Sequence, residues 1–431
     1  MTKRKPKDKP KPKCVATQKT IRFHDFFSPS EAINGNNSRL FVGRETLVLD
    51  AISDLARPSS TVIVYGERGG GKTSFARIVM HRACERNSTK NPISDAREIR
   101  FVWQKVSPGV ETLEDVLYRI MDPWLLGSES LARQFPGVTE LIEEDYRKLD
   151  PIKVMESSLG TTERILNPHQ KLVYSLFERV EQFILSNFPT SQPVIAIDEL
   201  DQLGDLDGLG RLIKNSSLNF LLVGIANNVE EIVADHKSAQ RKITKEYRIP
   251  RLDRQEVGRL FGIAEEIATE LGVRLKFTDS FSDEVFADSA GIPGRCQKLG
   301  AAVVERFSPN LMNGEDISVS KEDYINLLAR KDNPYIHDSI SSNLIDNCLS
   351  RGTSRWQILK ALGKKEPDGS KVGGLDDFKP AIRHNLKTWL EELAVDKVII
   401  FDKTKTKIAF ADADLWGEVR RRIRIQWEPN G

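Results

Sequence analysis

The feature that most constrains this chain is the stretch GERGGGKT, Gly66 to Thr73, which fits the pattern G-x-x-x-x-G-K-[ST] in full. The residues before it, STVIVY, form a short apolar run rich in β-branched side chains, and KTSFARIVMHRACER after it favours a helix. A strand, a glycine-rich loop and a helix in this order are the context that a phosphate-binding loop requires. A chance glycine-rich turn needs neither neighbour, so the sequence predicts a nucleotide site here.

Each position of this loop has a chemical role in the prediction. Backbone N–H groups can wrap phosphates where glycine supplies the positive φ angles. Lys72 would reach the β and γ phosphates, the Thr73 hydroxyl would bind Mg²⁺, and the helix start adds its positive dipole end. The expected nucleotide contacts are Gly66, Glu67, Arg68, Gly69, Gly70, Gly71, Lys72, Thr73 and Ser74.

Two further apolar runs end in polar residues that suit ATP hydrolysis. In VIAIDE, Asp198 could hold Mg²⁺, and Glu199 could orient and deprotonate the attacking water. In GIANN, Asn227, preferred over Asn228, could hold that water between the γ-phosphate and Glu199. The plain alternatives are an exposed strand end and a turn-forming Asn pair. A small-molecule kinase needs no water-activating glutamate, so the Asp-Glu pair favours a hydrolase.

The order of apolar runs and helical patterns predicts an α/β class with a parallel sheet covered on both faces. The runs IRFVWQKV, PVIAIDE, NFLLVGIAN and KEYRIPRL supply the remaining strands. Residues 37–252 form the expected nucleotide-binding domain, with 122–168 as a mixed insertion. Residues 253–333 read as a small helical lid domain. Residues 334–431 read as helices followed by a β-hairpin, the outline of a winged helix-turn-helix.

Composition limits the remaining possibilities. Residues 1–36 read as a disordered arm. Its first 13 residues carry seven Lys/Arg against one Asp. The arm is either a nucleic-acid-binding segment or a solvated tail. No apolar run is long enough to span a membrane, and no signal-peptide core follows the basic start. The four cysteines form no C-x-x-C pair. The expected location is therefore cytoplasmic, with no membrane partner.

Four motifs together resemble the AAA+ ATPases: FVGRE, GERGGGKTS, IAIDELD and VGIAN. The chain is most similar to the branch that contains origin-recognition and replication-initiator ATPases and the STAND-like ATPases, over about residues 39–333. The resemblance implies ATP and Mg²⁺ as cofactors. It also implies that FVGRE lies beside the adenine, which makes Phe41, Val42, Gly43 and Arg44 candidates for that side of the site.

The same resemblance implies two catalytic arginines. Arg241, in HKSAQRKITKEYRIPRL, would reach the nucleotide of a neighbouring subunit, and Arg295, in SAGIPGRCQKLG, would act as the second sensor. Each would place a fixed cation near charge that develops on the γ-phosphate. The alternative for either is a solvated arginine. GIPGR departs from the usual Gly-Asp-x-Arg, and residues 122–168 lengthen the chain before the acidic motif, so the subfamily stays open.

The C-terminal unit holds the candidate partner site. In initiator ATPases the winged helix binds duplex DNA, and FKPAIRHNLKTWLEEL would be the recognition helix here. Residues 335–431 carry 17 Lys/Arg against 14 Asp/Glu, which is only mildly basic, and winged helices also dock proteins. The final EVRRRIRIQW adds a cationic stretch. The expected DNA contacts are Lys379, Arg383, Lys387, Lys403, Lys405 and Lys407, with His384 beside them.

Two functions follow from these observations. The first is an ATP-binding, slowly hydrolysing switch that assembles into a homo-oligomer with a shared ATP site and binds duplex DNA. The second is a STAND-like regulatory ATPase, for example in bacterial antiviral defence, whose winged helix docks an effector protein. A processive motor has less support, because no aromatic pore loop stands out.

Overall fold

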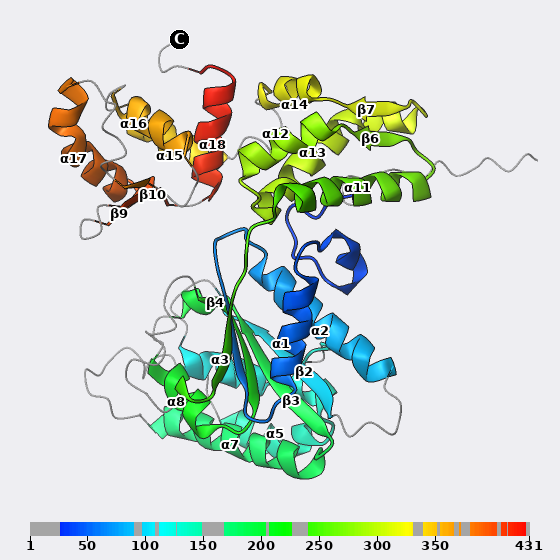
Figure 1. Ribbon diagram of the computed structural model, residues 1–431. Helices are drawn as coiled ribbons and strands as arrows, with labels where there is room; N and C mark the ends of the chain where they lie inside the picture. Colours follow the sequence, from blue (N-terminus) through cyan, green and yellow to red (C-terminus); the bar gives the residue numbers. More distant parts are fainter. Residues whose placement is uncertain are drawn as a thin grey trace, which may run out of the picture.

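The structure is a computed structural model that places three units side by side, an α/β unit, a helical lid and a C-terminal unit beside the lid (Figure 1). The residues that it describes are 26–89, 97–107, 112–125, 127–148, 168–203, 207–225, 240–330, 339–350, 354–365, 370–371, 380–402, 407–411 and 413–427. Within these residues, no helix is both long enough and apolar enough to cross a membrane.

A five-stranded parallel sheet is the centre of the α/β unit. Its strands are β1 (Thr61–Tyr65), β2 (Glu98–Lys105), β3 (Ser191–Asp198), β4 (Asn219–Ile225) and β5 (Ile243–Arg248). Their order in the sheet, β2-β3-β4-β1-β5, is typical of AAA+ ATPases. All five predicted strands are present, and the predicted α/β class is confirmed.

Helices cover both faces of this sheet because its central strands are apolar on both sides. Along β1, Val62 and Val64 face one core and Ile63 faces the other. The first face carries α1 (Glu45–Leu55) and α2 (Lys72–Thr89). The second face carries α3 (Leu113–Ile120), α4 (Leu131–Gln134), α5 (Val138–Lys148), α7 (Pro168–Asn187) and α8 (Asp207–Asn215).

Part of the predicted insertion 122–168 belongs to this second core. Leu131, Phe135, Val138 and Ile142 are buried there, so α4 and α5 pack as ordinary sheet-covering helices. Residues 149–167 lie outside the described part of the chain.

The predicted disordered arm, residues 1–36, is wrong for residues 26–36. Phe26 and Phe27 are fully buried, and the Phe27 ring packs against Phe261 of the lid with a centroid distance of 5.7 Å. A short helix, η2 (Gly35–Leu40), follows. The sequence gives no periodic pattern here because aromatic anchors in an irregular segment have no period. Residues 1–25 lie outside the described part.

The lid is helical, as the sequence predicts, and it also contains two short strands that the sequence pattern did not indicate. Its helices are α11 (Arg254–Glu270), α12 (Asp279–Ser289), α13 (Pro293–Met312) and α14 (Lys321–Leu328). The strands β6 (Leu275–Phe277) and β7 (Ile317–Val319) pair in parallel. At three residues each they are too short to show alternation.

The C-terminal unit has the element order of a winged helix-turn-helix. It contains α15 (Ser339–Leu349), α16 (Ser354–Gly363), β8 (Ser370–Lys371), α17 (Pro380–Val395), β9 (Ile399–Asp402), β10 (Lys407–Phe410) and α18 (Ala413–Arg424). β9 and β10 form the antiparallel hairpin of the wing, and β8 pairs with β10. The predicted hairpin is confirmed, and the final basic stretch is a helix, α18.

Candidate functional site

The glycine-rich loop lies between the end of β1 and the start of α2, as the sequence predicts. Gly69 and Gly71 have φ angles of 74° and 89°, in the region that side-chain-bearing residues rarely adopt. A Cβ at Gly70 would lie 2.9 Å from the carbonyl oxygen of Glu67. The loop therefore requires glycine for its own fold.

Lys72 lies at the mouth of this loop. Its Nζ donates hydrogen bonds to the carbonyl oxygens of Gly66 and Glu67, each at 3.0 Å. Burial lowers the pKa of Lys72, although the carboxylates of Asp201 and Asp198 favour its charged form. Lys72 forms no direct ion pair with a described residue, so an anionic phosphate would supply a counter-charge for this partly buried ammonium.

The predicted metal ligands, Thr73 and Asp198, are in contact. The Thr73 hydroxyl donates to both carboxylate oxygens of Asp198, at 3.0 and 3.3 Å. Asp198 is 2% exposed, and burial raises its pKa. Among the described residues, no group of three or more His, Cys, Asp or Glu could hold a metal alone. A hydroxyl and a carboxylate fit Mg²⁺ that shares its remaining ligands with water and phosphate.

Glu199 follows β3 in a left-handed conformation, with φ 58° and ψ 40°. Its carboxylate forms an ion pair with Lys105 at the end of β2, with an Nζ–Oε1 distance of 2.8 Å. A Cβ at Gly224 of β4 would lie 3.0 Å from the Glu199 Cα, so the two strand ends touch. Glu199, the candidate base, therefore lies at the carboxyl edge of the sheet. It follows β3, which is the neighbour of β4, and Asn227 comes after β4 in the sequence. Asn227 itself lies outside the described residues.

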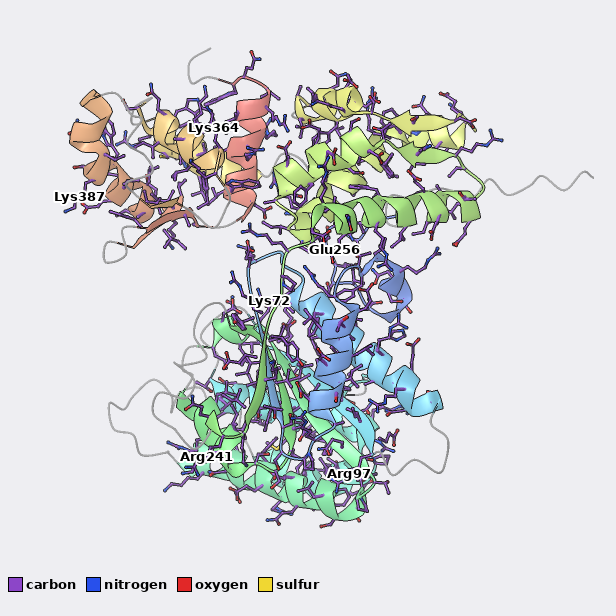
Figure 2. All side chains as sticks on the ribbon, in the orientation of Figure 1. Lys72, Arg97, Arg241, Glu256, Lys364 and Lys387 are labelled. Atoms are coloured by element: carbon purple, nitrogen blue, oxygen red, sulfur yellow. The ribbon has the colours of Figure 1, made fainter. Side chains whose placement is uncertain are left out.

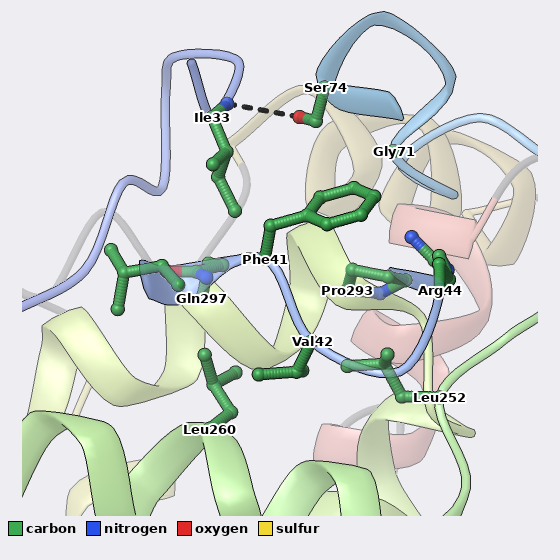
Figure 3. Close-up of a pocket in the computed structure, with 11 residues that line it drawn as sticks. Ile33, Phe41, Val42, Arg44, Gly71, Ser74, Leu252, Leu260, Pro293 and Gln297 are labelled. Carbon is green, nitrogen blue, oxygen red and sulfur yellow. Dashed lines mark hydrogen bonds between the residues drawn. The ribbon is translucent and has the colours of Figure 1, made fainter. Parts of the chain in front are cut away.

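A narrow cavity adjoins the loop where the resemblance places the adenine (Figure 3). Its volume is about 20 Å³, room for about one water molecule, so a base would enter only as side chains move. Gly43 lies against Glu256 of α11. The cavity is lined by Ile33, Leu40, Phe41, Val42, Arg44, Gly71, Ser74, Leu252, Leu260, Pro293 and Gln297.

Arg44 is the charged group of this cavity. It is 4% exposed, donates to the carbonyl oxygen of Pro250, and has no hydrogen-bond partner for its Nε among the described residues. Burial lowers its pKa to about 10. A Cβ at Gly71 would lie 3.0 Å from the Arg44 guanidinium, so this cation lies directly beside the phosphate loop.

The structure does not bring Arg295 to the loop. Its guanidinium is turned away from the loop. It donates to the carbonyl oxygen of Asp288 in the lid at 3.0 Å and lies 3.8 Å from Asp414 of the C-terminal unit. A Cβ at Gly417 of α18 would overlap it at 1.6 Å. The backbone beside it does reach the loop, because the Gly294 N–H donates to the Gly69 carbonyl at 3.0 Å.

Arg241 lies far from the loop of its own chain. It precedes β5, whose residue Ile243 pairs with Thr61 at the start of β1, whereas the loop follows the end of β1. Figure 2 shows Arg241 and Lys72 at opposite ends of the sheet. In this position Arg241 does not reach the loop of its own chain.

Few of the residues predicted to contact DNA lie in the described part of the chain. Lys387 is exposed on α17, at the side of the C-terminal unit away from the lid (Figure 2). The backbones of Arg383 and Lys407 lie in α17 and β10, and nothing is described of their side chains. Lys379, Lys403 and Lys405 lie outside the described residues.

The cationic end of the chain is engaged within the molecule. Arg421 and Arg422 pair with the buried Glu418, at 2.7 and 2.8 Å. Arg420 and Arg424 each lie 3.2 Å from Asp288 of the lid. α18 therefore joins the C-terminal unit to the lid through charged contacts rather than presenting its arginines to a ligand.

Sequence reasoning missed two features of the site. The N-terminal segment crosses it, since the Ile33 N–H donates to the Ser74 hydroxyl at 3.0 Å (Figure 3). Glu67 of the loop pairs with Arg251, which lies 184 residues further along the chain. No local spacing could indicate either contact, because each joins segments that meet only in the folded chain.

No family model matches the sequence, and no curated protein matches it. Solved structures are similar to the chain over most of its length. The ORC1 protein of Aeropyrum pernix in complex with DNA is 15% identical, with 88% of this chain and 92% of that chain covered and a TM-score of 0.42. The ADP form of the Aeropyrum pernix ORC2 protein is 14% identical, with 94% and 98% covered and a TM-score of 0.45.

A third similar structure is a STAND protein with a tetratricopeptide repeat sensor from Pyrococcus horikoshii. It is 13% identical, with 93% of this chain and 44% of that chain covered and a TM-score of 0.34. The fold class rests on this chain's own strand order, strand pairing and glycine-rich loop.

Proposed function

We propose that this protein is an ATP-binding, slowly hydrolysing AAA+ switch that assembles when ATP is bound and contacts duplex DNA through its winged helix. The observation that carries the proposal is the contact between Thr73 and Asp198 beside Lys72 and Glu199. These residues meet at the carboxyl edge of a parallel sheet, where such folds bind their ligands.

In this proposal each residue of the site has a defined role in binding or hydrolysing ATP. Lys72 holds the β and γ phosphates, and the loop glycines donate their N–H groups to them. Thr73 and Asp198 hold Mg²⁺, which neutralises phosphate charge when it is bound with the nucleotide. Glu199 takes a proton from the attacking water after it leaves Lys105.

In this proposal Arg241 and Arg295 make hydrolysis depend on assembly and on a rearrangement around the lid. Arg241 would complete the site of a neighbouring copy, because it lies at the wrong end of the sheet for its own site. Arg295 would reach the γ-phosphate only after it leaves Asp288 of the lid and Asp414 of the C-terminal unit. Slow turnover would follow, since hydrolysis would wait for both events.

The second candidate is a STAND-like regulatory ATPase whose winged helix docks a protein. The pairing of the α18 arginines favours it, because these cations are held by Glu418 and Asp288 and are not free to contact phosphates. DNA binding would then depend on the predicted contacts Lys379, Arg383 and Lys387 and on the wing lysines Lys403, Lys405 and Lys407, without the α18 arginines.

Size-exclusion chromatography with light scattering tests the proposal, with Glu199→Gln as the trapped form and Lys72→Ala as its control. With ATP, Glu199→Gln should elute as an oligomer and carry duplex DNA with it, and Lys72→Ala should remain a monomer. Assembly without DNA would favour the second candidate. An unchanged mass with ATP in every condition would overturn ATP-dependent assembly.

A further inference from the structure

The connection between β5 and α11, residues 249–253, links the α/β unit to the lid and runs alongside the nucleotide site. At one end, the Ile249 N–H donates to the carbonyl of Tyr65, the residue before the loop, at 2.9 Å. At the other end, the Leu252 N–H donates to the carbonyl of Gly291 in the lid at 2.8 Å. This core–lid hinge is therefore fixed to both sides of the site.

Between these two bonds, Arg251 forms a two-pronged ion pair with Glu67 of the loop. Its Nε and Nη2 donate to the two carboxylate oxygens at 2.6 and 2.9 Å. Both side chains are largely buried, at 18% and 29% exposed. The carbonyl of the same Glu67 accepts the Lys72 Nζ, so the pair is directly attached to the phosphate cradle.

The charge of Glu67 makes this pair more than a structural contact. A carboxylate in the loop would repel the phosphates that the loop must receive, and partial burial weakens the screening of that repulsion. A guanidinium fork matches a carboxylate in geometry and cancels its charge. Because Arg251 belongs to the hinge, the cancellation holds only while the hinge is against the loop.

We propose that Arg251 is a positioning residue for the nucleotide, which neutralises Glu67 and thereby lets the loop accept ATP only when the core–lid hinge is docked. The inference rests on the proposed function, because it takes the loop as an ATP site. It goes beyond that function by assigning the control of phosphate charge to a residue outside the loop.

Isothermal titration calorimetry with Mg-ATP and Mg-ADP tests it on four variants of the full chain. Arg251→Gln should weaken ATP binding by about tenfold or more, the effect of an uncompensated charge, and should weaken ADP less because ADP carries less charge. Glu67→Gln should bind ATP more tightly than the wild type, because it removes the repelling carboxylate and leaves the Arg251 cation beside the loop. Glu67→Gln with Arg251→Gln should return to within about threefold of the wild type.

Arg254→Gln is the matched control, since Arg254 makes a two-pronged pair with Asp283 on the lid, away from the loop. It should leave ATP affinity unchanged. The proposal is overturned if Arg251→Gln binds ATP as the wild type does, or if the double variant is as weak as Arg251→Gln. Where Arg251→Gln fails to fold, a tenfold loss of ATP affinity in Glu67→Gln would overturn it. A wild type that binds no ATP would instead overturn the proposed function.

Discussion

Lys105 holds Glu199 across the edge of the sheet, with 2.8 Å between Nζ and the carboxylate oxygen. The bond raises the pKa of Lys105. The candidate base is thus turned to the end of β2, and in the proposed mechanism it must leave this partner before it can act on water.

Lys105→Gln should therefore speed ATP hydrolysis. The pair is largely exposed, so its loss should raise the turnover number by about two- to fivefold, the range for such ion pairs. Steady-state ATPase assays at saturating ATP measure the change, with Lys214→Gln as an exposed control on α8. A turnover number equal to or below the wild type would mean that Lys105 does not restrain Glu199.

The contact between Arg295 and α18 depends on a glycine. At Gly417 a Cβ would lie 1.6 Å from the guanidinium, so Gly417→Ala should displace Arg295 and separate the C-terminal unit from the lid. Because the guanidinium is the far end of a flexible side chain and can swing aside, the cost should be at the low end for overpacked sites, about 1 kcal/mol of unfolding free energy. Small-angle scattering should show a more extended molecule.

Gly258→Ala is the matched control for this variant. It lies inside α11 with no atom within 4 Å of the added Cβ, and it should stabilise the protein by about 0.5–1 kcal/mol. An unchanged scattering profile for Gly417→Ala would show that the docked arrangement does not need the glycine.

The N-terminal segment should be part of the stable fold. Phe27 is fully buried against the lid, and Phe27→Ala should lower the unfolding free energy by about 3–5 kcal/mol. Chemical denaturation measures the loss, with the exposed Leu49→Ala as control, where a change within about 0.5 kcal/mol is expected. A Phe27→Ala protein as stable as the wild type would place the segment outside the core.

Because of Asp198, the free energy of unfolding and the affinity for Mg-ATP should depend on pH in opposite directions. Burial raises its pKa, so between its ordinary pKa and the raised value the folded chain binds more protons than the unfolded chain. Stability therefore falls as pH rises through this window, and Mg-ATP affinity falls as pH drops through the raised pKa.

Thermal unfolding without nucleotide, followed from pH 4 to pH 8, tests the first dependence. Asp198→Asn should flatten that dependence and melt above the wild type at pH 7, while its Mg-ATP hydrolysis is lost. A variant that melts lower at pH 7 would show that the ionised carboxylate stabilises the fold.

The wing lysines should carry the salt-dependent part of DNA binding. Changing Lys403, Lys405 and Lys407 together to Glu should weaken duplex binding by at least about tenfold and lower the salt slope by about three. Lys214, Lys245 and Lys276, exposed on other elements, give a control with the same charge change. Equal affinities for the two triple variants would favour the protein-docking alternative.

The sequence by itself determined the features that depend on neighbouring residues. The loop and all five strands follow from local spacing, because a phosphate loop, a buried strand and a helix each need only a short continuous pattern. The same spacing placed Thr73 at the start of a helix and Asp198 at the end of a strand, and the two residues meet at one edge of the sheet. The winged-helix outline was visible for the same reason.

Only the tertiary structure decided which charges face one another. Arg251 meets Glu67, and Arg295 turns from the loop to the C-terminal unit, through contacts between segments that are distant in the sequence. Phe27 is buried although its segment has no periodic pattern. A long cationic side chain goes to whichever carboxylate or carbonyl the packed elements bring within reach, and that choice has no signature in local spacing.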